Sequence, residues 1–137
     1  KDEPYLSITK GRYEALKPGQ YPMIDESLSV RSDGFYGVSK LFGENLGRSY
    51  CEKHKILVVC LRIGSVNKSD KPESTRDFAT FISHSDLAQL VEKCVEADSL
   101  TFEIFYGVSN NAWRFWDIKN AEEKLSYSPK DNAEDYR

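Results

Sequence analysis

The chain has 137 residues, of which 30% are charged and 39% hydrophobic, and its formal net charge is −3. This length fits one domain with a sizeable core. The charge offers no basic surplus for nucleic acid, and no apolar run approaches the roughly 20 residues of a membrane span. The first four residues are unlike a signal peptide. Because the cysteines lack metal-ligand spacing, we expect reduced thiols and a cytoplasmic protein: Cys51, Cys60, Cys94.

Residues 1–33 are predicted to form a long irregular connection, because they contain three of the five prolines and show little periodicity. Tyr13 and Lys17 are four residues apart and would share one face of a helix. However, Pro18 disfavours helical geometry at Lys17, so we expect no functional Tyr/Lys pair here.

A helix is predicted from Phe35 to about Lys53, because the stretch has no proline and apolar residues recur every three or four positions. Asp33 or Ser32 is expected to cap it. Its glycines each weaken the helix by up to about 1 kcal/mol, which predicts close packing against another element: Gly37, Gly43, Gly47. The residues of its apolar face are Phe35, Val38, Leu41, Phe42, Leu46, Tyr50.

Tyr36 and Lys40 lie one turn apart at the start of this helix. A nearby cation favours the phenolate, so Lys40 can lower the pKa of Tyr36. A shift from about 10 to about 7 requires roughly 4 kcal/mol, and it would let the phenol exchange a proton with a substrate hydroxyl at neutral pH. The spacing alone is weak evidence, and the element that follows must support it.

That element is a near-continuous apolar run, residues 56–65, which ends at Gly64-Ser65. It predicts a strand buried on both faces, as in a parallel sheet, and a helix followed by such a strand is half of an α/β repeat. Ligands of open parallel sheets bind at the carboxyl ends of the strands. The residues from Arg62 to Ser65 are therefore candidates to line a site.

The rest of the chain alternates loops and regular elements. Residues 66–75 are polar and follow the candidate strand, so they are either a lid or substrate loop or a solvated surface loop. Thr101–Val108 is predicted to form a second strand, and Trp116 to about Ser126 a last helix. Ser83–Asp86 has the spacing of a capping box and opens a helix with the apolar side Leu87, Leu90, Val91, Cys94, Val95.

The motif Tyr36-Gly37-Val38-Ser39-Lys40, followed by Gly43-Glu44 and Val59–Ser65, resembles the extended short-chain dehydrogenase/reductases, also called NAD-dependent epimerase/dehydratases. The resemblance covers nearly the whole chain. It is nearest to a uronate dehydrogenase-like subgroup, and the residues that carry this are Arg76, Ala79–Leu87, Tyr106–Asn111, Trp116-Asp117 and Pro129–Tyr136.

The resemblance implies roles for particular residues. Tyr36 would be the catalytic acid/base, and Lys40 would hold the cofactor ribose and lower the pKa of Tyr36. Ile63 would contact the nicotinamide, while Ser65 and Arg76 would bind the substrate. NAD is the implied cofactor, with NADP left open, and a homodimer is the implied assembly. An exposed arginine without a ligand is the alternative for Arg76.

Two expected parts of that family are absent from the sequence. No G-x-G-x-x-G loop follows a strand, although such a loop lets a dinucleotide pyrophosphate approach a helix N-terminus. The family's catalytic Ser or Thr also lacks a counterpart, because Ser7 and Thr9 have no strand context. We therefore expect the C-terminal portion of a Rossmann-type parallel sheet flanked by helices, inactive alone, with one edge of the 56–64 strand open.

The expected layout is a single domain: the connection 1–33, the Tyr/Lys helix and site strand 34–65, and a substrate-side part 66–137. The predicted function is NAD-dependent oxidation of a sugar acid to a lactone. A nucleotide-sugar epimerase or dehydratase, and a non-catalytic NAD-sensing or scaffold protein, are the alternatives. Trp113 and Trp116 form either a sugar-stacking wall or core. The sequence indicates no metal site and no nucleic-acid or membrane partner.

Overall fold

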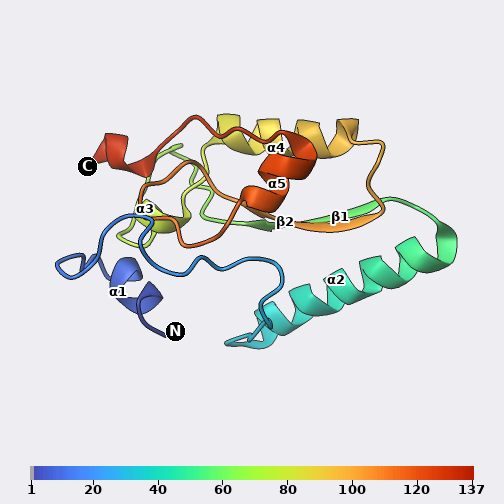
Figure 1. Ribbon diagram of the computed structural model, residues 1–137, viewed down its shortest axis with the longest axis horizontal. Coiled ribbons are helices and arrows are strands. Elements are labelled where there is room, and N and C mark those ends of the chain that lie inside the picture. The colour runs from blue at the N-terminus through green and yellow to red at the C-terminus, as the bar shows by residue number, and fades with distance from the viewer. Residues whose placement is uncertain (1) are drawn as a thin grey trace.

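A computed structural model describes residues 2–137. Its elements, in chain order, are α1 (Tyr5–Thr9), α2 (Phe35–His54), β1 (Val58–Ile63), α3 (Asp77–Thr80), α4 (His84–Glu96), β2 (Phe102–Gly107), α5 (Lys119–Leu125) and the 3-10 helix η1 (Ala133–Tyr136). The strands lie in the middle, with α2 on one side and α4 and α5 on the other (Figure 1). The result is a three-layer α/β arrangement.

The sheet consists of two parallel strands, and its register places Val58 opposite Phe102. Both predicted strands are confirmed, each slightly shorter than expected. The outer edge of β1 pairs with no strand among residues 2–137, as expected. The β1 side chains are only partly buried, so the predicted burial on both faces is wrong. A strand needs neighbours on both sides for such burial, and β1 has one.

Helix α2 packs on the sheet through its small residues. A Cβ added to Gly47 would lie 3.0 Å from the Val58 side chain, and Cys51 is buried. The predicted close packing is therefore confirmed at Gly47. It is wrong at Gly43, where a Cβ would meet nothing within 4 Å.

The start and the apolar face of α2 differ from the prediction. The helix begins after Gly34, which makes no side-chain cap, so the predicted cap by Asp33 or Ser32 is wrong. Most of the apolar face is exposed, because the small residues meet the sheet and nothing in the described chain covers the opposite side. The exposed residues of this face are Phe35, Val38, Phe42, Leu46 and Tyr50.

Two buried clusters hold the fold together. One lies between β2 and the helices α4 and α5, and it consists of Leu90, Phe105, Val108, Ile118, Ala121, Leu125 and Tyr127. The other joins α1 and the N-terminal segment to α3 and to the chain after β2, and it consists of Ile8, Tyr21, Ala79, Trp113 and Phe115. The core therefore sits on the face of the sheet opposite α2 and around the carboxyl ends of the strands.

Helix α4 begins as predicted, because the Ser83 hydroxyl accepts a hydrogen bond from the Asp86 amide at 3.0 Å. The predicted apolar side is wrong at Val95, which is 81% exposed. Helix α5 begins at Lys119 rather than at Trp116. The short elements α1, α3 and η1 were not predicted. No helix in residues 2–137 has the length and apolarity to cross a membrane.

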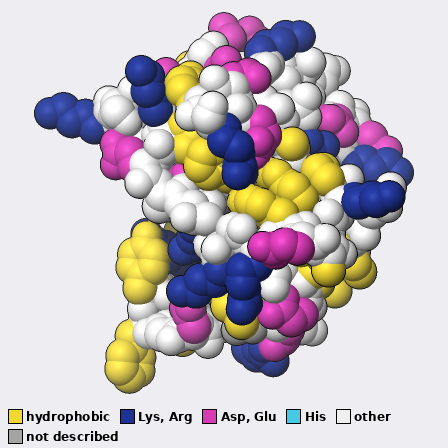
Figure 2. Space-filling view, turned by 90° about the vertical axis from the view of Figure 1, so that its left-hand side faces the viewer, with side chains coloured by type: hydrophobic (Ala, Val, Ile, Leu, Met, Phe, Trp, Pro, Cys, Tyr) yellow, Lys and Arg dark blue, Asp and Glu magenta, His cyan; other side chains and the backbone are white. Residues whose placement is uncertain are grey.

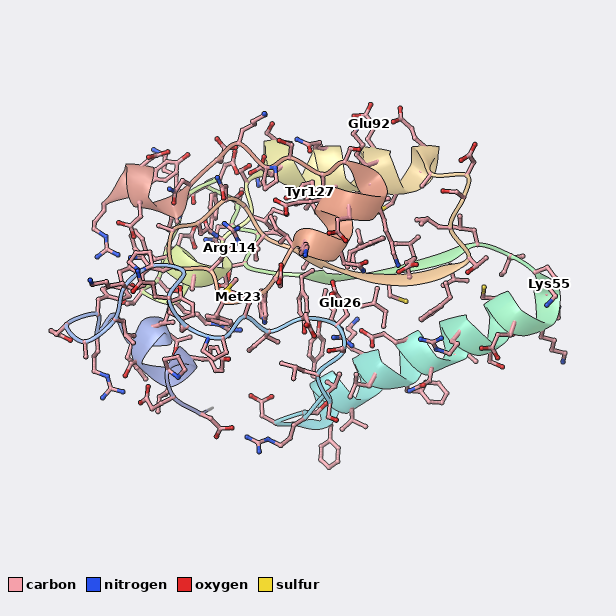
Figure 3. The ribbon with its side chains drawn as sticks, in the orientation of Figure 1. Met23, Glu26, Lys55, Glu92, Arg114 and Tyr127 are labelled. Atoms are coloured by element: carbon pink, nitrogen blue, oxygen red, sulfur yellow. The ribbon has the colours of Figure 1, made fainter. Side chains whose placement is uncertain are left out.

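The N-terminal segment is mostly irregular, as predicted, but it is attached to the sheet. Ile24 forms a parallel bridge with Trp116, and its amide donates to the Phe115 carbonyl at 2.7 Å. The Tyr106 amide donates to the Glu26 carboxylate at 3.3 Å. Figure 3 labels Glu26 on this segment. These contacts fix the segment beside β2, close to the carboxyl end of the sheet.

Candidate active site

Tyr36 and Lys40 occupy the first two turns of α2, and the Lys40 Nζ lies 5.1 Å from the centroid of the Tyr36 ring. The contact is a cation over an aromatic face, which is favourable in itself. Tyr36 is 77% exposed, and Lys40 is exposed as well. The predicted acid/base Tyr36 and its predicted partner Lys40 are therefore close together and accessible to other molecules.

The exit of β1 is held by a very close backbone approach. A Cβ on Gly64 would lie 1.9 Å from the Thr80 carbonyl oxygen. Beyond it, the Ser65 amide donates to that oxygen at 2.7 Å, and the two hydroxyls of Ser65 and Thr80 are 2.9 Å apart. Ile63, the last residue of β1, is 42% exposed. The strand thus presents an apolar side chain and a fixed hydroxyl at its carboxyl end.

The buried carboxylate of Asp77 binds the loop after β1 through several hydrogen bonds. Asp77 is 5% exposed and accepts hydrogen bonds from Asn67 (2.8 Å), from the Glu73 amide (2.9 Å) and from the Ser74 hydroxyl (2.9 Å). Burial raises the pKa of Asp77, but the hydrogen bonds from the Glu73 amide, Asn67, Ser65 and Ser74 outweigh it and lower the pKa overall. The loop is therefore held in place next to Arg76.

Arg76 lines a cavity of about 770 Å³ near the carboxyl ends of the strands. Tyr36, Lys40, Ile63 and Ser65 do not line it. Its other lining residues come from α1, from the N-terminal segment and from the chain around Trp116: Asp2, Tyr5, Thr9, Ile24, Leu28, Ser29, Val30, Arg31, Tyr106, Phe115, Trp116. Figure 2 shows the end of the molecule with α1 and both termini, where hydrophobic side chains lie exposed between basic and acidic ones.

The two tryptophans have different environments. Trp113 is buried and stacks on the partly buried Tyr13 ring at 4.1 Å, whereas Lys17 is exposed. Residues 13–17 are not helical, as predicted. Trp116 lines the cavity and stacks on Tyr106, with ring centroids 5.5 Å apart and an 11° angle between the planes. Trp116, rather than Trp113, therefore forms an aromatic wall.

The sequence did not single out Glu44 as a partner of Arg62. The Arg62 guanidinium donates to both Glu44 oxygens at 2.8 and 2.9 Å, and to the Tyr106 hydroxyl at 3.1 Å. Hydrogen bonding to Glu44 raises the pKa of Arg62 despite partial burial. No local sequence signal indicates this pair, because the two residues lie 18 positions apart on different elements.

Two further titratable side chains, His84 and Glu26, have structural partners. The His84 ring lies 2.9 Å from the Asn67 carbonyl oxygen at the start of α4. Burial raises the pKa of Glu26, beside the outer edge of β2. All three cysteines are unpaired. Within residues 2–137, no group of three or more His, Cys, Asp and Glu is arranged to hold a metal ion.

Comparison with known proteins gives this geometry a context. No protein-family model matches the chain. NAD-dependent glucose-6-phosphate dehydrogenase from Haloferax volcanii is 41% identical over 124 residues, which cover 90% of this chain and 47% of that enzyme. Uronate dehydrogenase from Pseudomonas syringae pv. tomato is 36% identical over 118 residues, or 86% and 42% of the two chains. This chain is homologous to the uronate dehydrogenases and related NAD-dependent sugar dehydrogenases. The predicted family resemblance is confirmed.

The similarity extends to three dimensions. A mutant uronate dehydrogenase from Agrobacterium tumefaciens, complexed with NAD, matches with a TM-score of 0.78 and 36% identity over 85% of this chain and 43% of that one. The predicted fold class is therefore confirmed, since the α/β layers correspond to part of the Rossmann-type structure of a uronate dehydrogenase. The chain spans less than half the length of each of these three relatives.

Proposed function

We propose that this chain is the proton-transfer and substrate-side portion of an NAD-dependent oxidoreductase that acts on a sugar or a sugar acid. The observation that carries the proposal is the Tyr36–Lys40 contact of 5.1 Å, at the start of a helix, in a homologue of NAD-dependent dehydrogenases. A phenol that is accessible to a substrate hydroxyl is suited to act as the acid/base group.

Tyr36 would take the proton of the anomeric hydroxyl of a uronate as the lactone forms. The chemistry that bound NAD would supply is acceptance of the hydride from the anomeric carbon. Lys40 would hold the cofactor ribose beside Tyr36. Ile63 provides an apolar surface for the nicotinamide. The exposure of these three side chains supports this assignment, since all are accessible to a cofactor.

The cavity beside Arg76 is the proposed place of the substrate. A guanidinium binds a carboxylate through two parallel hydrogen bonds, and the Trp116 ring can stack on a sugar face. Ser65 is a proposed substrate contact at the exit of β1, outside the lining of this cavity. About 770 Å³ lies within the range of small-molecule sites, roughly 300 to 1,000 Å³.

A sugar phosphate is the second candidate substrate. Arg31 lines the same cavity as Arg76, and its guanidinium is paired with the Asp2 carboxylate at 2.9 Å, so the charged lining residues leave one net positive charge. The Haloferax volcanii relative is, by its name, a glucose-6-phosphate dehydrogenase. Parallel assays with glucuronate, galacturonate and glucose 6-phosphate distinguish the two classes.

The test uses the protein expressed from its full open reading frame, with NADH formation as the readout. Tyr36→Phe is expected to lower kcat by at least about 100-fold, because it removes the proton acceptor. Tyr50→Phe, an exposed tyrosine on the same helix, is the matched control and should keep the wild-type rate. An unchanged rate in Tyr36→Phe refutes the proposal. Sugar epimerisation without NADH formation supports the epimerase alternative, and NAD binding without turnover supports the sensing alternative.

A further inference from the structure

Arg62 makes the one hydrogen-bonded ion pair that joins α2 to the sheet within residues 2–137. Its guanidinium faces the Glu44 carboxylate as a fork, with both N–O distances below 3 Å, and the two side chains are only 17% and 16% exposed. Such two-point pairs fix direction as well as distance, and partial burial weakens their screening by salt.

The helix end of this pair lies next to the proposed acid/base residues. Glu44 follows Lys40 by four residues and Tyr36 by eight, so the three side chains lie along one side of α2. The fork from Arg62 therefore holds α2 one turn away from Lys40.

The sheet end of the pair reaches the cavity. Arg62 and Tyr106 are register partners on neighbouring strands, and the guanidinium donates to the Tyr106 hydroxyl at 3.1 Å. Tyr106 stacks on Trp116, and both rings line the cavity that contains Arg76. One side chain thus contacts both the helix that carries the proton acceptor and the wall of the proposed substrate cavity.

The other contacts between α2 and the sheet lie far from Lys40. The apolar face of the helix is largely exposed, and the helix packs on the sheet through Gly47, Cys51 and Arg48, whose guanidinium lies 4.2 Å from the centroid of the Phe102 ring. All three residues lie more than a turn away from Lys40 toward the C-terminus. Close to Lys40, the ion pair with Arg62 is the directional contact with the sheet.

We propose that the Glu44–Arg62 pair positions α2, so that Tyr36 and Lys40 stand at a fixed place relative to the cavity with Arg76. This proposal rests on the proposed dehydrogenase function. Glu44 and Arg62 are positioning residues that act through Tyr36 and Lys40, without contact with the reacting atoms.

The test is Glu44→Gln in the protein expressed from its full open reading frame. The amide keeps the size of the side chain but loses the charge and one acceptor oxygen. A small misplacement of the proton acceptor is expected to lower kcat by about 10- to 100-fold, while KM stays within about twofold because the cavity is intact. Glu134→Gln is the matched control, since Glu134 and Arg137 form a similar two-point pair on η1.

Both variants are assayed well below their melting temperatures. If Glu44→Gln lowers the melting temperature but keeps the wild-type kcat, the pair is structural only and the proposal is wrong. A raised KM with an unchanged kcat also overturns it. If Glu44→Gln does not fold, Arg62→Lys is measured instead, because lysine keeps the charge but lacks the planar fork.

Tyr36→Phe, assayed in parallel, distinguishes failure of the positioning role from failure of the proposed function. An inactive Tyr36→Phe together with a fully active Glu44→Gln refutes the positioning role alone. A fully active Tyr36→Phe refutes the proposed function and, with it, the positioning role.

Discussion

The backbone of Gly64 approaches the carbonyl oxygen of Thr80 so closely that a Cβ on the glycine would lie 1.9 Å from that oxygen. No real Cβ tolerates such a distance, and the obstacle is backbone that cannot rotate away. This contact brings the end of β1 against the end of α3, and it places Ser65 and Arg76 on the same side of the structure.

Gly64→Ala is therefore expected to destabilise the fold by about 1–3 kcal/mol, because strand and helix must move apart. Gly43→Ala is the matched control. A Cβ there meets nothing within 4 Å, so the change should stabilise α2 by about 0.5–1 kcal/mol. Denaturant unfolding measures both. Equal effects of the two substitutions would contradict the close approach at Gly64.

Sequence patterns that span only a few residues predicted the local structure well. The hydroxyl of Ser83 and the amide of Asp86 are three residues apart, and this spacing sufficed to place the start of α4. The apolar face of α2 misled for the opposite reason. Periodicity indicates that Phe35 and Phe42 share a face, but burial of that face depends on what packs against it. In the described chain the face is exposed, and Gly47 packs against the sheet instead.

The candidate site shows the same difference between contacts within one element and contacts between elements. Tyr36 and Lys40 are neighbours because of helical spacing, so the sequence predicted their contact. The ion pair of Glu44 with Arg62 joins residues 18 positions apart on different elements. No local pattern encodes such a pairing, since it depends on how α2 lies across β1.

The cap of α4 can be tested directly. Ser83→Ala removes the acceptor for the Asp86 amide and the hydroxyl that donates to Asp131, so a loss of about 1–2 kcal/mol is expected. Ser85→Ala, an exposed serine in the same turn, should change stability by less than about 0.5 kcal/mol. Thermal unfolding compares them. A Ser83→Ala protein as stable as Ser85→Ala would show that the cap contributes nothing.

Asp77 predicts a dependence of stability on acid pH. Its pKa in the fold is below the ordinary value of 3.8, so folding favours the ionised carboxylate. The stabilisation is complete above that value and is lost as the pH falls through the lower pKa of the folded state. Asp77→Asn should cost about 1–3 kcal/mol at neutral pH and flatten the acid limb of the stability curve. The exposed Asp98→Asn serves as control, and identical acid limbs in the two variants would refute the role of Asp77.

The cavity wall can be observed by fluorescence, because Trp113 and Trp116 are the only tryptophans. Trp116 lines the cavity and Trp113 is buried against Tyr13, so only Trp116 should respond to a sugar acid. In Trp113→Phe, glucuronate is expected to change the emission of Trp116 in a saturable way. When Arg76→Ala is added to this variant, the affinity for glucuronate should fall at least about tenfold, because the carboxylate loses its charged partner. In Trp116→Phe the same titration should leave the emission unchanged. A change in Trp113 emission, or an affinity for glucuronate that is unchanged by Arg76→Ala, would contradict the placement of the substrate in this cavity.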